Sequence, residues 1–486
     1  TVSDHAVFPA ATNKISSAWE NGIHLEWANS NTITGNTITK MEENGIYLHL
    51  EGVSSNTIMY NIISDNGKGI KIYRTNSNTI MHNVISNNDN GLYFYDSSFN
   101  IIRDNNISNN GNGIDFDSDS WCNNNTITDN IISNNEDWSI VCYGSNSTIK
   151  DNYVSNNGGG ISAGSNIVIG NTVLNNSKYG IYGGGIVTGN TVLNNPKYGI
   201  YSGGIVTGNI VSNNEYGILG GDSITGNIVT NNTYGIFHGD IVTGNTVTNN
   251  EYGIRLYYYN SQIISDNNIS NNRYGIAIDD SSNNTISGNN INSNYENGIY
   301  LTESNDNIIY DNSISNNLMC GILLEHSNNN NITYNIISSN SEEGIFFIDS
   351  NNNLIEGNNI SRNEDGIEFE DSNINIVSGN IIYSNSDHGI EIIDQSTNNT
   401  IKHNTVGSNI MGIYFDNSDN NIILQNNLLK NNQYALFKNC KNSWDQNYWN
   451  RPRLFPKLIF GKILIRKIEI PWFNIDWHPA KEPYVI

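Results

Sequence analysis

A short pattern of polar and apolar residues repeats along almost the whole chain. Each copy has an Asn-rich turn, an aromatic or polar residue, a Gly-Ile pair and then alternating apolar and polar positions. The glycine recurs every 18 to 26 residues from Gly22 to Gly412, and Ser139 and Ala435 hold its place in two degenerate copies, which makes twenty copies. Such self-similarity predicts a solenoid, because one repeat cannot bury its own apolar face and must stack on its neighbours.

Each copy contains three short segments that we expect to be extended. After Gly180 they are residues 181–182, 186–188 and 191–193, and Gly-Asn or Asn-Asn pairs separate them. Short β-branched runs bounded by Gly and Asn indicate strands, and no segment before the C-terminal tail has a helical apolar period. We therefore predict an all-β fold, a right-handed parallel β-helix of about 20 coils that stack about 4.8 Å apart into a rod of about 95 Å.

The repeat divides the chain into three predicted parts. Residues 21–437 form the β-helix, residues 1–20 an N-terminal cap that includes Pro9, and residues 438–486 a C-terminal cap without repeats. Caps are expected because the strand edges at the ends of a solenoid template aggregation unless they are covered. Two interpretations of the C-terminal part stand: a hydrophobic plug alone, or a plug that also contacts the next copy and gives a head-to-tail filament. The residues expected in these cap and assembly contacts are Trp444, Trp449, Arg451, Arg453, Trp472 and Trp477.

The net charge of −24 is unevenly distributed. Residues 438–486 hold nine Lys/Arg against four Asp/Glu, and the other residues hold 14 against 43, a net charge of −29. So acidic a shaft repels phosphate, which argues against nucleic acid as a partner, and it suits an extracellular setting. No apolar run is long enough to span a membrane. No signal peptide is visible, and the start at Thr1-Val2 is that expected of a processed or trimmed product.

Asparagine recurs in phase with the repeat, for example at Asn171, Asn190 and Asn209. Asn tolerates the left-handed conformation that sharp corners need, and stacked Asn amides form hydrogen-bonded ladders. In a secreted chain the Asn-x-Ser/Thr sequons are glycan acceptors, but an Asn-rich chain also produces sequons by chance, so we expect a minority to be modified. Outside the predicted ladders the candidate acceptors are Asn106, Asn124, Asn146, Asn268, Asn283, Asn331, Asn359 and Asn398.

The cadence Asn-Asn-x-x-Gly-Ile-x-Leu…Asn-Thr-Ile-x-x-Asn over residues 20–437 resembles the repeat of NosD-like and sugar-hydrolase-type parallel β-helix proteins. The ending, with Asn447-Tyr448-Trp449-Asn450 and Asp476-Trp477-His478-Pro479, resembles the terminal segment of secreted archaeal surface proteins. The resemblance implies a group that includes surface-layer and adhesin-like proteins, polysaccharide lyases, epimerases and the copper-site maturation factor NosD. Fold alone does not choose among these activities.

Resemblance to the lyases implies a carboxylate cluster for Ca²⁺ beside an Arg or Lys base. Arginine is scarce in this chain, and the best match combines Arg255 and Tyr257 with Asp279 and Asp280 one coil later. The alternative for these residues is a surface ion pair, which stabilises a fold only weakly.

Acidic residues also recur at the end of the Gly-Ile segment in the C-terminal half, with Glu368 and Glu391 on a neighbouring column. Stacked carboxylates would repel one another unless cations bind between them; the alternative is a solvated face. The denser spacing typical of a Ca²⁺ loop occurs only at Asp115, Asp117 and Asp119. We expect no required cofactor, with Ca²⁺ as a candidate ligand there. The recurring acids are Asp279, Glu303, Glu325, Asp349, Glu370, Asp394 and Asp416.

Aromatic side chains gather where the repeats are shortest. Tyr182, Tyr201 and Phe237 follow their glycines by two residues, where exposed rings would stack on sugars. The nine His are scattered without His-x-His or Met clusters, which does not support copper handling. The four Cys do not predict a disulfide framework, and whether Cys122 and Cys142 pair is left open.

These features predict a non-catalytic extracellular structural protein. It would be a subunit of a cell-surface filament, sheath or surface layer, with copies of itself as partners, head to tail or side by side. The alternative is a secreted protein that binds or modifies cell-surface polysaccharide in the manner of a lyase or epimerase, with the Arg255 region as its site.

Overall fold

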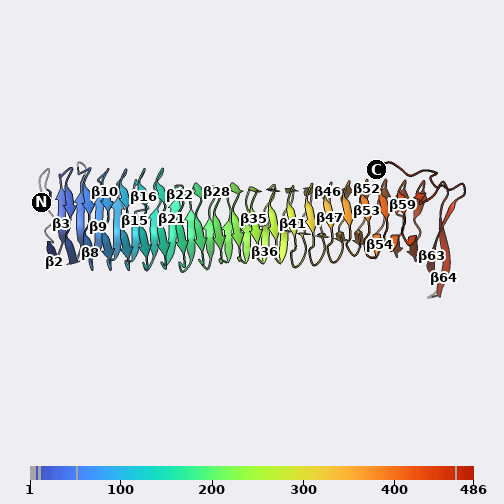
Figure 1. Ribbon diagram of the computed structural model, residues 1–486, viewed down its shortest axis with the longest axis horizontal. Helices are drawn as coiled ribbons and strands as arrows, with labels where there is room; N and C mark the ends of the chain where they lie inside the picture. The colour runs from blue at the N-terminus through green and yellow to red at the C-terminus, as the bar shows by residue number, and fades with distance from the viewer. Residues whose placement is uncertain (1–6, 9–12, 51–52, 466–467) are drawn as a thin grey trace. The chain divides into compact units, whose positions relative to one another are not determined.

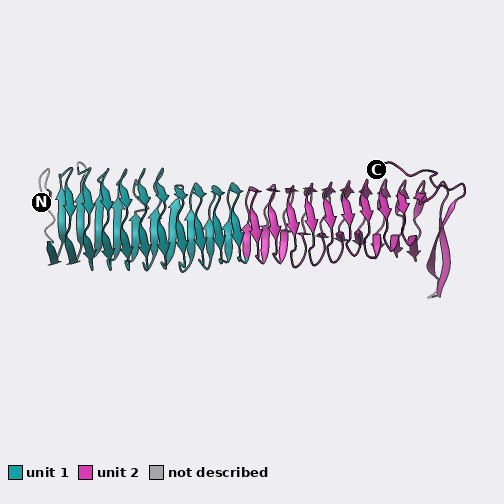
Figure 2. Ribbon diagram, viewed as in Figure 1, with its two compact units in different colours: residues 1–233 teal, residues 234–486 magenta. Residues whose placement is uncertain are grey.

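The computed structural model describes residues 7–8, 13–50, 53–465 and 468–486. The chain forms a right-handed parallel β-solenoid of about 20 turns, with no helix in these residues, as the sequence predicts. It divides into two compact units, residues 1–233 and 234–486, which are described separately (Figure 2). No helix in the described part of the chain is long and apolar enough to cross a membrane.

Each coil has three strands in a fixed order (Figure 1). The first is the Gly-Ile strand, of four to six residues. The second is in most coils a three-residue strand, from β4 (Thr32–Thr34) and then every third strand to β61 (Ser443–Asp445). The third begins with β2 (Lys14–Ala18) and ends with β62 (Tyr448–Trp449). Within each unit the strands pair in parallel with their equivalents in the next coil, as Ile80 with Ile102 and Ile85 with Ile107.

The Gly-Ile strands carry most of the side chains considered below. In unit 1 they are β3 (Asn21–Glu26), β6 (Asn44–His49), β9 (Lys68–Tyr73), β12 (Asn90–Tyr95), β15 (Asn112–Phe116), β18 (Trp138–Cys142), β21 (Gly159–Gly164), β24 (Tyr179–Gly183), β27 (Tyr198–Tyr201) and β30 (Tyr216–Leu219). In unit 2 they are β33 (Tyr234–Phe237), β36 (Tyr252–Tyr257), β39 (Tyr274–Asp279), β42 (Ile299–Thr302), β45 (Ile322–Glu325), β48 (Ile345–Ile348), β51 (Ile367–Glu370), β54 (His388–Ile393), β57 (Met411–Asp416) and β60 (Gln433–Lys438).

The core consists of columns of apolar side chains, one from each strand of a coil. Ile70, Ile80 and Ile85 in one coil of unit 1 are fully buried, and so are their equivalents in the neighbouring coils. Phe rings stack inside as well, with Phe94 and Phe116 4.3 Å apart between ring centres. This burial of one β-branched side chain per short strand is the main stabilising contribution.

The repeating glycine is required by close approach of the backbone. A Cβ atom on Gly45 would lie 2.6 Å from the carbonyl oxygen of Gly69 in the next coil and 2.8 Å from the side chain of Ile63. Both distances are shorter than any carbon contact that packing tolerates, so a larger residue would push the coils apart. The glycine that makes the repeat visible in the sequence therefore marks where the Gly-Ile strand turns inward.

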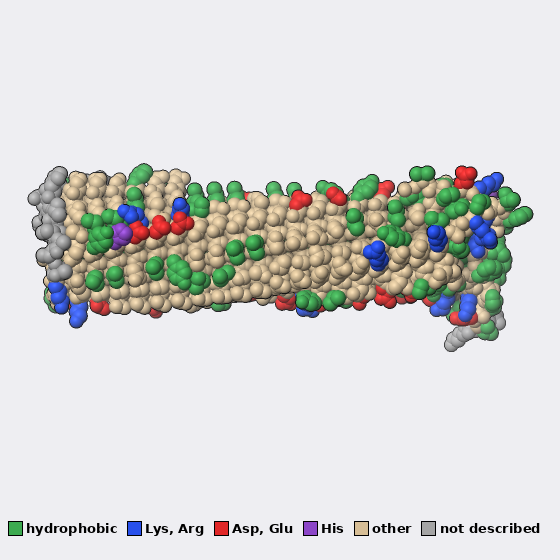
Figure 3. All heavy atoms as spheres, in the orientation of Figure 1, with side chains coloured by type: hydrophobic (Ala, Val, Ile, Leu, Met, Phe, Trp, Pro, Cys, Tyr) green, Lys and Arg blue, Asp and Glu red, His purple; other side chains and the backbone are tan. Residues whose placement is uncertain are grey.

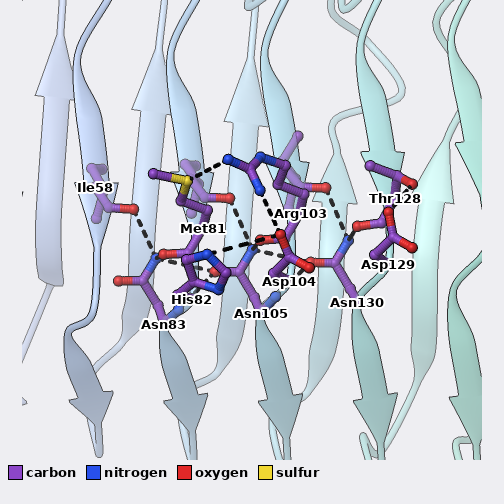
Figure 4. Close-up of polar contacts among 12 residues, drawn as sticks. Ile58, Met81, His82, Asn83, Arg103, Asp104, Asn105, Thr128, Asp129 and Asn130 are labelled. Carbon is purple, nitrogen blue, oxygen red and sulfur yellow. Dashed lines mark hydrogen bonds and ion pairs between the residues drawn. The ribbon is translucent and has the colours of Figure 1, made fainter.

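The predicted asparagine ladders are confirmed (Figure 4). The Nδ2 of Asn83 donates to Oδ1 of Asn105 at 3.0 Å, and the Nδ2 of Asn105 donates to Oδ1 of Asn130 at 3.0 Å. Each amide lies inside a corner whose preceding residue has a positive φ, 54° at His82 and 57° at Asp104. The asparagine side chains thus form hydrogen bonds with backbone N–H and carbonyl groups that cannot pair with a neighbouring strand at the sharp corner.

The ends of the chain extend the ladders further than the repeat indicated. At the N-terminal end β2 pairs with β5 (Thr37–Met41), so residues 14–18 are already part of a coil; Pro9 lies outside the described residues. At the C-terminal end β61 and β62 pair with the preceding coil, so the ladders reach Trp449, past the predicted boundary at 437.

A hairpin follows the last coil. Strands β63 (Lys457–Ile465) and β64 (Ile468–Asp476) pair with each other antiparallel along their whole length. Only short parallel pairings join the hairpin to the coil: β63 to β60 through Gly461 and Lys462, and β64 to β61 through Asp476. Figure 1 shows the hairpin extending away from the last coil of unit 2.

Candidate functional site

The predicted pair Arg255 and Asp279 does meet on the outer face of β36 and β39. Both Nε and Nη2 of Arg255 lie 2.8 Å from one carboxylate oxygen, Oδ2 of Asp279. The guanidinium also lies 4.5 Å from the ring centre of Tyr252 and 5.6 Å from that of Tyr257. Burial opposes the charge, but the Asp279 carboxylate raises the pKa of Arg255 above its usual value. An arginine held in this way keeps its proton, so the geometry is that of a packed ion pair more than of a base; Asp280 follows at the corner.

The predicted calcium residues lie in and after β15 of unit 1. Asp115 is half-buried, and burial followed by the charge of Asp117 raises its pKa to about 6. The hydroxyl of Tyr93 donates to Asp117 Oδ2 at 2.5 Å, and the backbone N–H of Asp119 donates to Asp117 Oδ1 at 2.9 Å. These three carboxylates are not among the groups of the described residues whose ligand atoms converge within 4.8 Å. Calcium binding there stays a prediction.

The row of acids predicted in unit 2 is wrong as a single column. Glu325 pairs in register with Thr302 on one side and with Ile348 on the other. Asp349 instead occupies the corner, with φ 47°, one position further along the coil. The acids named from the sequence thus alternate between the strand column and the corner column, and at the corner Asp349, Asp371 and Asp394 follow one another in successive coils.

A denser group of ionisable side chains lies on β48, β51, β54 and the residues just before them. We name it the Asp365 cluster. The pairing of β51 with β54 places Glu368 beside Glu391, and these two residues project on the outer face. The residues that directly precede Gly344, Gly366 and Gly389 lie beside them. The members of the cluster are Glu343, Asp365, Glu368, Asp387, His388 and Glu391.

His388 is the centre of the contacts in this cluster. Its Nδ1 lies 3.1 Å from Oδ1 of Asp365 and 3.6 Å from Oε2 of Glu391, and its Nε2 lies 3.8 Å from Oδ1 of Asp387. The ring stacks on Tyr414, with 5.2 Å between centres. The imidazole is therefore held in one orientation with carboxylates near both nitrogens.

The environment shifts the pKa of several members. Burial, and then the charges of Glu391, Glu343 and Asp365, raise the pKa of Glu368 to about 9. Burial raises the pKa of Glu391 to about 7 even though His388 opposes the shift. Burial lowers the pKa of His388, but the hydrogen bond to Asp365 and the charges of the surrounding carboxylates raise it by more, so the pKa lies above its usual value. In chemical terms the cluster can hold protons, exchange them between neighbouring carboxyls, or hold a cation.

Cys320 continues the group one coil earlier, where its thiol donates to Oε2 of Glu343 at 3.0 Å. Burial and the Glu343 carboxylate raise its pKa above the usual value, which keeps the thiol protonated and unreactive. All four cysteines are buried free thiols in the structure, including Cys122 and Cys142.

Sequence reasoning identified Glu368 and Glu391 but missed Glu343, Asp365, Asp387 and His388. Three of the missed residues, Glu343, Asp365 and His388, occupy the position before the glycine, which holds Tyr in six other copies, from Tyr179 to Tyr274. The available signal was that three consecutive copies place an ionisable residue there.

The six predicted cap and assembly residues differ in their surroundings. Trp449 is buried and its Nε1 donates to Asp476 Oδ2 at 2.9 Å, and Trp444 is buried against it with 5.8 Å between ring centres. Trp472 and Trp477 are exposed, and they line a groove of about 700 Å³ together with Phe473. Arg451 is exposed, and burial followed by Arg451 lowers the pKa of the half-buried Arg453.

The predicted glycan-stacking rings pack in part against neighbouring aromatic side chains. Tyr182 and Tyr201 are exposed at their edges and tilted against each other, with 5.0 Å between centres. In unit 2, Phe237 packs on Tyr234 at 5.2 Å and on His238 at 4.1 Å. Seven of the eight predicted glycan acceptors are exposed and Asn359 is half-buried, so all eight lie outside the buried ladders. Their modification stays a prediction.

Comparison with known families agrees with the strand pattern. The family described as "Right handed beta helix region" matches residues 10–147 and 220–349, more than half of the chain. The chain belongs to the right-handed β-helix family. The family described as "Periplasmic copper-binding protein (NosD)" matches residues 314–461, a range that contains the Asp365 cluster. A search of curated proteins finds no significant match.

Several solved β-helix structures are similar to this chain. The Dettilon tailspike protein is 16% identical over 66% of this chain, with a TM-score of 0.40, and the match spans 62% of the tailspike. The periplasmic alginate epimerase AlgG is 14% identical over 76% of this chain and 77% of its own, with a TM-score of 0.34. The A-module of the Azotobacter vinelandii mannuronan C-5 epimerase AlgE6 is 13% identical over 76% and 88%, with a TM-score of 0.19. At these identities the likeness concerns the fold alone.

The copper named for the NosD family was tested against the residues in the matched range. The convergent groups there contain one imidazole, from His388, and one thiol, from Cys320; the other ligand atoms are carboxylate oxygens. Copper handling is better served by several imidazoles or by thioether and thiolate sulfurs. Within the described residues this donor set therefore lacks the several imidazoles or the sulfur ligands that copper handling uses.

Proposed function

We propose that the protein is a non-catalytic extracellular structural protein whose copies associate end to end through the C-terminal hairpin. The observation that carries this proposal is the exposure of apolar side chains on both strands of the hairpin. Phe460 is 61% exposed and Ile468 65%, and Trp472 and Phe473 are about half exposed. A two-stranded hairpin alone in water is marginally stable, and a contiguous apolar surface marks an interaction site. In Figure 3 hydrophobic and basic side chains gather at this end of unit 2.

The partner we propose is the first coil of a second copy. Trp19 is 80% exposed there and Trp27 is also exposed, and Glu20 and Glu26 lie beside them in the sequence. Within the described residues the pairing of β3 is with β6. Strands at the ends of a solenoid are sites for pairing with another chain. An acidic, aromatic end complements the basic, aromatic C-terminal part, residues 438–486, to which the hairpin belongs. Such heterologous contacts form an open filament when the rotation does not close.

Sedimentation velocity and negative-stain microscopy of the purified chain test the proposal. We expect polymers that grow at low salt and shorten at high salt, because the charged ends attract each other only within a Debye length. Replacing Phe460 and Trp472 together by serine should yield monomers. The matched control is Ile336→Ser, which removes an exposed apolar side chain from the shaft and should leave assembly intact. A monodisperse monomer at every salt concentration would overturn the proposal.

A second candidate is a polysaccharide-binding or polysaccharide-modifying protein. The observation that favours it is the in-register pair Glu368 and Glu391 beside His388, whose pKa values burial raises to about 9 and about 7, since acid–base chemistry on sugars uses paired carboxyls of unequal pKa. New ultraviolet absorbance from unsaturated uronates, or retarded migration in gels that contain acidic polysaccharide, would support it. Neither effect across a panel of acidic glycans would remove it.

A further inference from the structure

The Asp365 cluster brings metal-ligating atoms together in a way that the proposed assembly does not use. One ligand atom from each of Asp365, Asp387 and His388 lies within 4.8 Å of the other two. Glu343, Asp365 and Glu368 form a second such group, so Asp365 belongs to both. Three successive coils contribute these residues, and the parallel pairing of β51 with β54 fixes their spacing.

The cluster has more buried negative charge than its own basic groups balance. Glu368 is only 9% exposed, and the neighbouring charges that act on it are those of Glu391, Glu343 and Asp365, all carboxylates. The one basic side chain among the members is His388. A buried carboxylate must be protonated, paired with a base or bound to a metal. A cation would remove the repulsion without requiring the carboxyls to keep their protons.

The imidazole is placed as a ligand would be. Asp365 accepts from the backbone N–H of His388 at 2.5 Å and lies 3.1 Å from Nδ1, so it fixes the ring from one side. The opposite nitrogen, Nε2, faces Oδ1 of Asp387 at 3.8 Å, which is too long for a hydrogen bond. Two ligands of one cation stand about 3–3.6 Å apart when each lies about 2.1 Å from the metal, so a small inward movement of Asp387 would complete the pair. A carboxylate on the far nitrogen is the usual orienting partner of a metal-bound histidine.

We propose that Asp387 and Nε2 of His388 bind a divalent cation of the Zn²⁺ and Mn²⁺ class, with Asp365 on Nδ1 as the residue that orients the imidazole and Glu343 and Glu368 as supporting carboxylates. One imidazole among carboxylate oxygens is the donor set that these ions share. Asp387 is 51% exposed and gives the ion access from solvent, whereas Asp365 and His388 are largely buried and hold it in place. The site lies within the range that matches the NosD family, but its oxygen-rich donors set it apart from a copper site.

Calorimetric titration with Zn²⁺ and electron paramagnetic resonance with Mn²⁺, both on the full chain after chelator dialysis, test this site. We expect one saturable site in the unmodified protein. His388→Gln and Asp387→Asn should each weaken it about 10-fold to 100-fold, as loss of a ligand or its orienting partner does. Asp387 is half exposed, so its variant keeps the test valid should a buried substitution unfold unit 2.

The matched control is His326→Gln. His326 and Asp349 form a similar pair on an outer corner of unit 2, 3.6 Å apart, but both are half exposed and belong to no convergent group of the described residues. The affinity of the His326→Gln protein for Zn²⁺ should equal that of the unmodified chain. Equal affinities in the unmodified, His388→Gln and Asp387→Asn proteins, or no saturable binding at all, would overturn the proposal. Polymer formation is scored separately on the chelated protein, so failure of the cation site and failure of the assembly proposal are distinguishable.

Discussion

Replacement of Asn105 by alanine isolates the contribution of the asparagine ladder to stability. Asn105 follows β13 (Ile101–Arg103) in unit 1 and is only 1% exposed. Its Oδ1 accepts from the backbone N–H and from the Nδ2 of Asn83, each at 3.0 Å. Its Nδ2 donates to the carbonyl oxygens of Ile80 and Arg103 at 2.9 Å and to Oδ1 of Asn130 at 3.0 Å. One side chain thus completes five hydrogen bonds in three coils.

The expected magnitude follows from the groups that alanine leaves without partners. The backbone N–H of Asn83 loses its acceptor, and a buried unsatisfied group costs about 1–3 kcal/mol. The Nδ2 of Asn83 keeps the carbonyl oxygens of Ile58 and Met81 as acceptors, so we assign the loss mainly to the backbone N–H. The free energy of unfolding of unit 1 should fall by about 1–3 kcal/mol. Because each coil contacts only its neighbours, the loss of amide-exchange protection should centre on the coils that contain Asn83 and Asn130.

Urea unfolding followed by far-ultraviolet circular dichroism, with amide exchange by mass spectrometry, measures both expectations. The matched control is Asn106→Ala, one residue further along, where the side chain is exposed and lies outside the ladder. An exposed substitution of this kind changes stability by less than about 0.5 kcal/mol. Equal losses for the two variants, or a loss below about 1 kcal/mol for Asn105→Ala, would refute the assignment of stability to buried amide partners.

Three further predictions concern charge and backbone packing. Because burial raises the pKa of Asp115 to about 6, its contribution to stability is complete below the ordinary carboxyl pKa and is lost as the pH rises through about 6. The free energy of unfolding of unit 1 should therefore fall by about 1–2 kcal/mol over this pH range, after solvent screening, and Asp115→Asn should remove that fall when urea unfolding is repeated at each pH. Gly298→Ala places a Cβ 2.7 Å from the carbonyl of the next coil and should lower the melting temperature of unit 2 by the equivalent of about 1–3 kcal/mol or more, whereas Gly208→Asn, in an open corner at φ 63°, should be nearly neutral. Arg255→Lys loses the contacts of the planar guanidinium with Asp279 and the tyrosine rings, so it should lower the free energy of unfolding, measured with urea, by about 1–2 kcal/mol. A loss equal to that of Asp279→Ala would show that lysine replaces none of the arginine contacts.

The fold was predictable because the same physical constraint recurs in each coil. A backbone carbonyl one coil away leaves no room for a side chain at the repeating glycine, as at Gly45. The ladder asparagine is hydrogen-bonded to the equivalent asparagines of the coils before and after it, as at Asn105. Both constraints act at one sequence position per repeat, so they appear directly as periodicity. The ends were less predictable: β61 and β62 pair without the Gly-Ile signature, and the period alone could not reveal them.

The acid row in unit 2 was misread because the offset from the glycine alternates. Asp279 and Glu325 follow their glycines by four residues, but Glu303 and Asp349 follow theirs by five. The fourth position ends the strand, and the fifth turns the corner with a positive φ, as at Glu303. One residue of difference moves a side chain to another column, and careful counting from the glycine would have separated the two sets.

The Asp365 cluster follows from the same geometry that makes the fold visible. Asp365 and His388 stand 23 positions apart in the sequence, yet parallel stacking brings them within 3.1 Å. A solenoid can therefore assemble a polar site by substitution at one repeat position in three consecutive coils, without altering a loop. The cost is that all the carboxylates project from one face at the strand spacing of about 4.8 Å, where they repel one another. The fully buried apolar columns and amide ladders on the inner side do not relieve that repulsion, since they contain no charge. A cation bound at the outer face would relieve it, and this is the physical reason for the cation site that we propose.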